Sequence, residues 1–375
     1  MAGKQTAMRI AYILTSLGIG GAERQALLLA ERMAERGHAV TVVTLRPRQA
    51  EEWATSLDPH YLGLRKTPVS LVGGLAQARR ILRSFEPDLV HSHCFHSNIF
   101  ARLLRLAGPA APLISTIHNV YEGAWPRMLA YRLTDPLCRR TTAVSEAAAL
   151  RSMRLKAVPR RKCSVLTNGI DTAEFAPCCD RRARMRSQMG VEGEFIWLAA
   201  GRIAPSKDYP NLLRAFSLVR AARPAACLWV AGEGSGADLA PLRALAAELS
   251  IGDRVRWLGL RREMPALLDA ADGFVLASAW EGMPLAVGEA MAMEKPVVAT
   301  DVGGVRELVG EDGRIVLSKS AEALAEAMLG MMEAAPEVRF ALGSAARQCI
   351  ETRFSMDAKA DEWEALYRLV LEPDR

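Results

Sequence analysis

Short apolar runs that alternate with amphipathic segments constrain the fold of this 375-residue chain more than any other feature. Residues 9–15 are almost continuously apolar, as in a strand buried on both faces, and residues 22–36 then show apolar side chains at helical spacing. Gly37 ends this predicted helix, and residues 39–45 form the next predicted strand. A strand, a helix and a strand in direct succession predict parallel pairing through a helical crossover.

The same alternation continues through both halves of the chain. Further strands of the first half are predicted at 88–91, 112–117, 141–144 and 164–166, with helices at 75–85 and 97–106. Strands of the second half are predicted at 195–200, 227–231, 255–258, 273–276 and 296–299. The pattern predicts a doubly wound α/β fold.

Turn-forming residues indicate where one domain ends and the next begins. Asn168-Gly169 and Pro177 mark a linker region, which predicts Rossmann-like domains at residues 1–174 and 175–355. The last predicted helix lies in the segment 356–375, and the sequence leaves open which domain it packs on. Because ligands of such sheets bind beyond the carboxyl ends of the strands, we expect the functional site in a central cleft between the two domains.

Cysteine usage and hydropathy indicate the cellular compartment in which the protein is expected. The seven cysteines are an odd number without CxxC spacing, which favours reduced thiols over a disulfide framework or a structural zinc site. No run approaches the roughly 18 apolar residues of a spanning helix, and the N-terminus lacks the pattern of an export signal. We therefore expect a cytoplasmic protein without a membrane span.

Two glutamates in the second half form the most informative motif. Glu281 and Glu289 lie on either side of a predicted loop-to-helix transition, so they can contact different parts of one ligand. Carboxylates accept hydrogen bonds from vicinal hydroxyls, and backbone N–H groups near a helix start bind anions. A sugar linked to a diphosphate needs both kinds of contact. Either glutamate alone would be read as an ordinary loop or helix residue.

This motif resembles the donor signature of the retaining GT-B glycosyltransferases of family 4, and the resemblance covers nearly the whole chain. It implies that Glu281, followed by Gly282, contacts hydroxyls of the donor sugar and that Glu289 contacts the ribose. The amides of Met283 and Leu285 would supply further donor contacts. The family often has Phe-Gly where this chain has Met283-Pro284, so the packing around the donor sugar is expected to differ.

A loop with two cations follows the first predicted strand of the second half. Arg202 and Lys207 can neutralise a leaving diphosphate, on which negative charge accumulates as the glycosidic bond breaks. Family members carry similar cations in this loop as diphosphate ligands. Solvent-exposed cations are the alternative interpretation, although cations near a helix start oppose the helix dipole.

The first predicted strand is followed by a glycine-rich loop, Gly18-Ile-Gly20-Gly21-Ala-Glu23. A dinucleotide fingerprint would place its third glycine at position 23, which disfavours a dehydrogenase. Similar loops in the family lie near the donor phosphate and the acceptor. We therefore expect Gly20 and Gly21 at the donor and Glu23 on the acceptor side.

Histidines follow two predicted strands of the first half. His118 comes directly after residues 112–117, and the resemblance implies that it contacts the donor sugar beside the reacting ring. His93 and His96 are expected to line the acceptor side, because their spacing alone does not establish a metal site. No Asp-x-Asp pair is present to hold a divalent ion, so we expect no metal and no cofactor beyond the nucleotide-sugar co-substrate. Ser145 and Asn168 match further family loops, although a helix cap and a turn would also explain them.

Positive charge is concentrated in the first half of the chain. Residues 1–175 contain 24 Lys and Arg against 13 Asp and Glu, and eight of these cations lie between residues 139 and 162. Such a basic segment suits an anionic membrane surface or a phosphate-bearing acceptor, and a solvated face is the equal alternative. Nucleic acid is disfavoured because no recognition motif accompanies the charge.

These observations together favour a retaining, metal-independent glycosyltransferase. We expect it to move a hexose or N-acetylhexosamine from a UDP-sugar to a glycan or lipid-linked acceptor at the inner face of the membrane. The expected process is the synthesis of a cell-envelope polysaccharide such as lipopolysaccharide. His118, Glu281, Arg202 and Lys207 are the predicted catalytic residues. The alternatives are a nucleotide-sugar epimerase or hydrolase of the same fold and a non-catalytic sugar-nucleotide binding protein.

Overall fold

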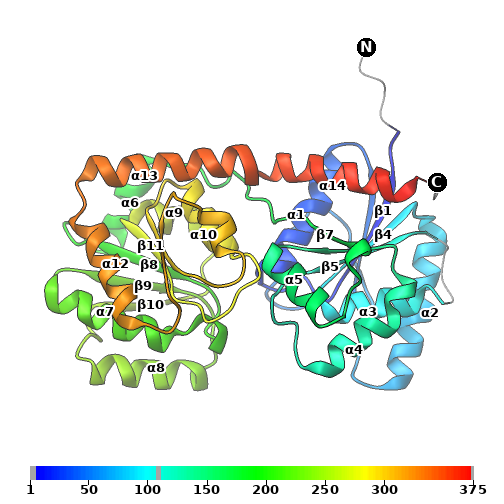
Figure 1. The fold of residues 1–375 in the computed structure, drawn as a ribbon, viewed down its shortest axis with the longest axis horizontal. Helices are drawn as coiled ribbons and strands as arrows, with labels where there is room; N and C mark the ends of the chain where they lie inside the picture. Colours follow the sequence, from blue (N-terminus) through cyan, green and yellow to red (C-terminus); the bar gives the residue numbers. More distant parts are fainter. Residues whose placement is uncertain (1–5, 107–110, 373–375) are drawn as a thin grey trace, which may run out of the picture. The chain divides into compact units, whose positions relative to one another are not determined.

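The computed structural model describes residues 6–106 and 111–372 and divides the chain into two compact units. Unit 1 comprises Met1–Gly169 with Met356–Arg375, and unit 2 comprises Ile170–Ser355. Each unit has a parallel sheet flanked by helices, which confirms the predicted doubly wound fold class (Figure 1). The division falls at Gly169, a few residues before the predicted boundary at 174.

Within its described residues, unit 1 has a seven-stranded sheet in the order β3-β2-β1-β4-β5-β6-β7, and all neighbouring strands are parallel. The strands are β1 (Arg9–Leu14), β2 (Ala39–Thr44), β3 (His60–Tyr61), β4 (Leu89–His93), β5 (Leu113–Ile117), β6 (Arg140–Ala143) and β7 (Cys163–Val165). The helices are α1 (Gly21–Glu35), α2 (Pro68–Phe85), α3 (Phe95–Leu104), α4 (Trp125–Thr134), α5 (Glu146–Arg154) and α14 (Met356–Leu371), with 3-10 turns η1 (Asp135–Leu137) and η2 (Arg160–Lys162).

Alternate side chains of β1 enter two different cores. Tyr12 and Leu14 pack with residues of α1 and α14 on one face of the sheet, whereas Ala11 and Ile13 pack with residues of α2 and α3 on the other. Both faces of this strand are therefore buried. This burial explains why its sequence is a continuous apolar run rather than an alternating one.

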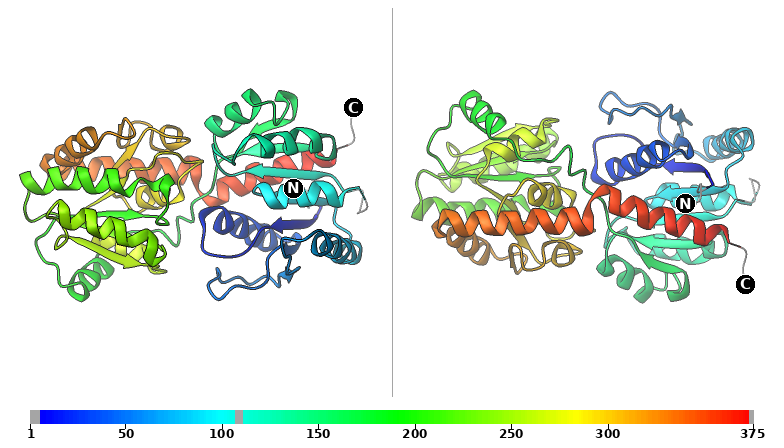
Figure 2. Two further views of the ribbon diagram at one scale, coloured as in Figure 1. Left: turned by 90° about the horizontal axis from the view of Figure 1, so that it is seen from below. Right: turned by 90° about the horizontal axis from the view of Figure 1, so that it is seen from above.

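The C-terminal helix α14 completes unit 1. Its Trp363 and Tyr367 are buried, and the Tyr367 hydroxyl forms hydrogen bonds with the Tyr12 hydroxyl (3.0 Å) and with Nδ1 of His91 (2.7 Å). Figure 2 shows α14, drawn in red, lying beside α1, drawn in blue, and side chains of both helices share one core. The last segment of the chain thus belongs to the same core as the first strand.

Unit 2 has a six-stranded parallel sheet in the order β10-β9-β8-β11-β12-β13, within its described residues. Its strands are β8 (Ile196–Ala200), β9 (Cys227–Ala231), β10 (Val255–Gly259), β11 (Gly273–Leu276), β12 (Val297–Thr300) and β13 (Arg314–Val316). Its helices are α6 (Cys179–Gln188), α7 (Tyr209–Ala222), α8 (Gly236–Glu248), α9 (Met264–Ala270), α10 (Leu285–Ala292), α11 (Val305–Val309), α12 (Ala321–Glu333) and α13 (Pro336–Cys349), with a 3-10 turn η3 (Pro205–Lys207) and a π-helical turn η4 (Ile350–Phe354).

Helix α2 is longer than the sequence predicts. It begins at Pro68 instead of residue 75, because Thr67 caps it by accepting a hydrogen bond from the Ser70 amide (3.2 Å) and proline suits the first helical position. Val69 and Val72 in its first turns are 83% and 67% exposed, so this part lacks the buried stripe on which the prediction depended. Helix α3 likewise begins at Phe95 instead of residue 97.

Candidate active site

The carboxyl ends of β8, β11 and β12 carry three loops that the parallel sheet brings to one edge of unit 2. These strands are neighbours, and the strand order reverses between β8 and β11. Open α/β sheets bind ligands at such a switch point. The three loops contain the predicted cations Arg202 and Lys207, the predicted glutamate Glu281, and the glycines Gly303 and Gly304.

Glu281 lies at the centre of a hydrogen-bonded cluster. Its Oε1 accepts a hydrogen bond from Lys207 Nζ (2.6 Å) and another from Ser278 Oγ (2.7 Å). The side chains of Lys207 and Glu281 are 20% and 12% exposed, so the ion pair is partly screened from water. The Ser278 carbonyl in turn accepts a hydrogen bond from Thr300 Oγ1 (2.7 Å), which ties the loop to β12. The carboxylate is therefore held in place through Oε1.

A close backbone contact holds the Glu281 loop against the loop after β12. Gly303 has φ +55°, and a Cβ atom there would lie 2.1 Å from the carbonyl oxygen of Glu281. The Gly304 amide donates a hydrogen bond to the Gly282 carbonyl (2.7 Å). Only glycine fits both this conformation and this spacing at position 303.

The loop after β8 places its two cations differently. Lys207 ends η3 and reaches Glu281, whereas Arg202 is exposed and forms no ion pair with any carboxylate in the described part of the chain. The Gly201 carbonyl between β8 and Arg202 accepts a hydrogen bond from the Tyr209 hydroxyl (2.7 Å). Burial, and to a smaller extent the charge of Glu281, raises the pKa of Tyr209, so this phenol stays protonated as a donor.

The other donor-side predictions lie in and before α10. Glu289 is in the middle of this helix and Leu285 is its first residue, while Met283 is buried with 7% exposure. Pro284 at the N-cap gives no side-chain cap, so the first amides of α10 can bond to a ligand or to water. Glu281 is in the loop and Glu289 in the helix, as the loop-to-helix interpretation predicts.

In unit 1, two histidines meet at the carboxyl ends of β4 and β5. His93 ends β4 and His118 follows β5, and Nδ1 of His93 lies 2.9 Å from Nε2 of His118. Burial lowers the pKa of His118 to about 4 and lowers that of His93 well below its ordinary value, with His91 and His118 contributing to the latter. Both rings are neutral at neutral pH, so a single proton bridges the two nitrogens. The tautomers of the two rings are therefore linked, because one of these nitrogens donates and the other accepts.

The remaining predicted residues of unit 1 are more scattered. Gly20 is the N-cap of α1, Gly21 its first residue and Glu23 in its first turn. His96 is exposed on α3, and Asn168 is buried after β7. Ser145 is fully buried and caps α5 by accepting a hydrogen bond from the Ala148 amide (3.2 Å). The cap accounts for Ser145 without a ligand.

Several supporting residues were not predicted from the sequence. Ser278 and Thr300 hold Glu281 in place, and Tyr209 holds the carbonyl of Gly201. In unit 1, Glu122 accepts hydrogen bonds from the Tyr131 hydroxyl (2.8 Å) and the His118 amide (3.3 Å). Burial raises the pKa of this carboxyl group. Among these residues, Ser278 could have been suspected from the sequence, because it is close to Glu281 in the chain.

Residues 6–106 and 111–372, which the structure describes, contain neither a candidate metal cluster nor a membrane-spanning helix. No three His, Cys, Asp or Glu side chains among them converge to hold a metal ion. No helix in this part of the chain has the length and apolar character required to cross a bilayer.

Comparison with known proteins identifies the class. The profile described as Glycosyltransferase Family 4 matches residues 19–174, and the one described as Glycosyl transferases group 1 matches residues 194–334. Fold and comparisons together define a glycosyltransferase with the GT-B fold. The chain belongs to glycosyltransferase family 4, as the sequence motifs predicted.

Individual relatives cover most of the chain. A D-inositol 3-phosphate glycosyltransferase of Pseudarthrobacter chlorophenolicus is 32% identical over 74% of this chain and 70% of its own length. The UDP-Gal:alpha-D-GlcNAc-diphosphoundecaprenol alpha-1,3-galactosyltransferase of Escherichia coli is 24% identical over 77% of each chain. The structure of Anabaena HepE in complex with UDP and glucose superimposes with a TM-score of 0.85, at 20% identity over 96% of this chain and 99% of that one, and this likeness concerns the fold.

Proposed function

We propose that this glycosyltransferase moves a hexose or N-acetylhexosamine from a UDP-sugar to a glycan or lipid-linked acceptor, with retention of the anomeric configuration. The observation that carries the proposal is the Lys207–Glu281–Ser278 cluster at the switch point of unit 2. It joins a cation suited to a diphosphate with a carboxylate suited to sugar hydroxyls.

Each residue of the cluster has a proposed role in donor binding. Oε1 of Glu281 is fixed by Lys207 and Ser278, while Oε2 forms no hydrogen bond with the described residues and is proposed to accept one from a sugar hydroxyl. Arg202 and Lys207 stabilise the diphosphate as negative charge develops on it, and Glu289 binds the ribose. The backbone at Gly282, Met283 and Leu285 supplies the nearby donor contacts.

Unit 1 is proposed to supply His118 and the acceptor-side residues. A neutral imidazole whose tautomer is linked to that of His93 can donate or accept one hydrogen bond to the donor sugar through its other ring nitrogen. No step requires a side-chain nucleophile or a metal ion, because positioning and charge stabilisation do the work. Gly20 and Gly21 are proposed to approach the donor, and Glu23, His93, His96 and Asn168 to serve the acceptor side.

The choice of donor and acceptor class is supported by the relatives. The Escherichia coli relative is named for UDP-Gal and a diphosphoundecaprenol acceptor, and the Anabaena structure contains UDP. We accordingly propose a role in envelope polysaccharide synthesis on the cytoplasmic side of the membrane, with an anionic membrane surface as a partner.

A donor panel tests this proposal. The purified protein is incubated with labelled UDP-, GDP- and ADP-sugars and a bacterial lipid extract, with EDTA present, and nucleotide release and label in lipid are measured. We expect UDP release and lipid labelling that both require the extract, and an axial or equatorial anomeric proton that matches the donor in the NMR spectrum of the product. Release that ignores the extract would favour a hydrolase or epimerase, and an inverted product would refute retention.

Variants connect the activity to the cluster. Glu281→Gln and Lys207→Met should each lower kcat by about 100-fold or more, as expected when one preorganised group is removed from a developing charge. The matched control is Glu333→Gln, which removes an exposed ion pair with Arg223 elsewhere in unit 2 and should leave kcat unchanged. Equal effects of all three variants would contradict the assigned site.

A further inference from the structure

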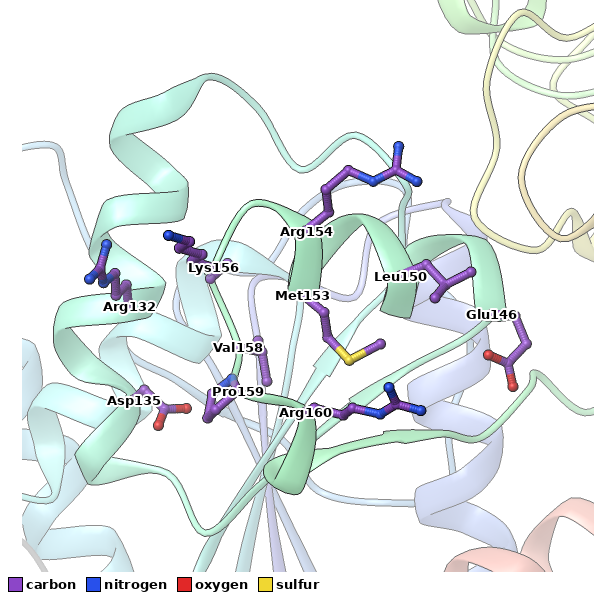
Figure 3. A pocket seen from close by; sticks show the side chains of 11 residues that line it. Arg132, Asp135, Glu146, Leu150, Met153, Arg154, Lys156, Val158, Pro159 and Arg160 are labelled. Carbon is purple, nitrogen blue, oxygen red and sulfur yellow. The ribbon is translucent and has the colours of Figure 1, made fainter.

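A basic pocket lies on unit 1 beside α5, apart from the residues assigned above (Figure 3). We call it the α5 pocket, and its volume is about 750 Å³. It is lined by Arg132, Asp135, Glu146, Leu150, Met153, Arg154, Lys156, Ala157, Val158, Pro159 and Arg160. These residues come from the end of α4, from η1, from α5, from the segment 156–159 and from the first residue of η2.

The charge of the α5 pocket is mainly positive, and its cations are exposed and can bind an anion. Arg132, Arg154, Lys156 and Arg160 are exposed, and none of them forms an ion pair with a carboxylate among the described residues. Asp135 is already paired with Lys162, at 3.1 Å. The other carboxylate, Glu146, lies at the opposite end of α5 from Arg154. In Figure 3 the side chains of Arg154 and Arg160 extend on opposite sides of Met153.

Helix dipoles do not account for all of these cations. Arg132 and Arg154 lie in the last turns of α4 and α5, where a positive charge is favourable in any helix. Lys156 and Arg160 lie outside both helices and still border the same cavity. The clustering of all four around one pocket therefore needs a further cause.

Apolar side chains accompany the positive charge. Val158 is buried and Met153 is half-buried, and both line the pocket. Leu150 and Leu155 on the same segment are 55% and 43% exposed, and Leu133, next to Arg132, is 70% exposed. Exposed leucines beside unpaired cations suit the boundary between lipid headgroups and acyl chains, where the cations meet phosphate and the leucines meet hydrocarbon.

We propose that the α5 pocket binds the phosphate headgroup of an anionic lipid and so attaches unit 1 to the surface of a bilayer. Arg154, Lys156 and Arg160 bind the phosphate, and Leu150 and Leu155 enter the interface. This inference deepens the proposed function and rests on it for the membrane-borne acceptor. Binding itself needs neither donor nor transfer, so the two proposals can fail separately.

Vesicle binding tests the proposal directly. The full chain is sedimented at low salt with vesicles of phosphatidylcholine alone or with one third phosphatidylglycerol, without nucleotide sugar. Each cation near an anionic surface contributes about 1 kcal/mol, or about fivefold. The triple variant Arg154→Gln/Lys156→Gln/Arg160→Gln should therefore bind the anionic vesicles about 100-fold more weakly, while its circular dichroism spectrum stays that of the wild type.

Two further variants separate the possible causes. The control Arg184→Gln/Arg214→Gln/Arg243→Gln removes the same charge from exposed positions on α6, α7 and α8 and should lower binding by less than about tenfold. Leu150→Ser/Leu155→Ser keeps every charge and should weaken vesicle binding. It should leave the affinity for inorganic pyrophosphate unchanged when this is measured in an Arg202→Gln/Lys207→Met background, which removes the proposed diphosphate site of unit 2.

Several results would overturn the assignment. It fails if the wild type ignores phosphatidylglycerol or if the pocket triple and the unit 2 triple lose equal affinity. Loss of pyrophosphate binding when the pocket triple is added to the Arg202→Gln/Lys207→Met background, with vesicle binding intact, would show a site for a soluble phosphate instead. Transfer activity measured on a detergent-solubilised acceptor reports on the proposed function independently of all these outcomes.

Discussion

Replacing Gly303 by alanine tests whether the backbone of the Glu281 loop leaves no room for a Cβ atom at position 303. Alanine at φ +55° costs about 1–2 kcal/mol because its Cβ crowds the following carbonyl group. The same Cβ would also lie 2.1 Å from the Glu281 carbonyl oxygen, an overlap with backbone that adds about 1–3 kcal/mol. Gly303→Ala should therefore lower the free energy of unfolding by about 2–5 kcal/mol.

Gly190→Ala is the matched control in the same unit. Gly190 has φ +60° after the end of α6, and nothing lies within 4 Å of a Cβ placed there. Its cost should be the conformational part alone, about 1–2 kcal/mol. The excess cost at position 303 measures the overlap.

Urea denaturation followed by circular dichroism gives both free energies, and calorimetric titration with UDP gives the functional result. A shifted Glu281 loop should weaken UDP-sugar binding in Gly303→Ala more than UDP binding, whereas Gly190→Ala should bind both as the wild type does. Equal destabilisation by the two substitutions would refute the argument, because it would mean that the loop yields at no cost.

Three further outcomes are expected. Cys94→Gly should raise the free energy of unfolding by about 1 kcal/mol in urea denaturation, because φ 69° and ψ 161° form a conformation that glycine alone adopts readily; a loss of stability would contradict this. His118 stays neutral to about pH 4 in the folded protein but takes up its proton near pH 6.5 when unfolded, so stability falls as the pH drops from 6.5 towards 4. His118→Asn should remove up to about 2 kcal/mol of the loss between pH 7.5 and pH 5, and an unchanged loss would exclude this cause. Asp269→Ala should lower the free energy of unfolding by about 3 kcal/mol, because it removes the 3% exposed carboxylate that pairs with Arg181. Asp253→Ala, at the exposed pair with Arg220, should lower it by less than about 1 kcal/mol. Similar values for the two substitutions would show that burial does not determine the strength of these ion pairs.

The central strands could be predicted because burial on both faces leaves a continuous apolar run. Residues 9–15 and 195–200 were predicted in this way, and the structure has β1 at Arg9–Leu14 and β8 at Ile196–Ala200. The edge strands β3 and β13 were missed, since two or three residues with little burial leave no pattern in the sequence. Local signals thus give the middle of each sheet and one of its two edges, β7 in unit 1 and β10 in unit 2, and they miss the opposite edges.

The pairing of site residues could not be predicted, because it depends on strand order. Lys207 and Glu281 are each recognisable in the sequence, but they are 74 residues apart and meet only because β8 and β11 are neighbours. His93 and His118 likewise meet through β4 and β5. Motifs identify the residue types, and the topology decides which atoms touch.

Residues that are grouped in the sequence can also be separated in the structure, as the basic segment 139–162 shows. In the sequence it is a single segment with eight cations, yet in the structure these cations have different partners. Lys162 pairs with Asp135 and donates to two backbone carbonyls, and Arg140 donates to the Arg161 carbonyl. Arg154, Lys156 and Arg160 remain around the α5 pocket, joined by Arg132 from outside the segment.

The position of α14 has a consequence for the order in which the chain can fold during synthesis. Unit 2 is complete in sequence once Ser355 has been made, although its first residue follows more than a hundred residues of unit 1. Unit 1 still lacks Trp363 and Tyr367 at that moment, so the face of β1 and β4 that they cover stays open to water. The domain that is begun first on the ribosome is therefore finished last, and a chain that stops before α14 leaves that core uncovered.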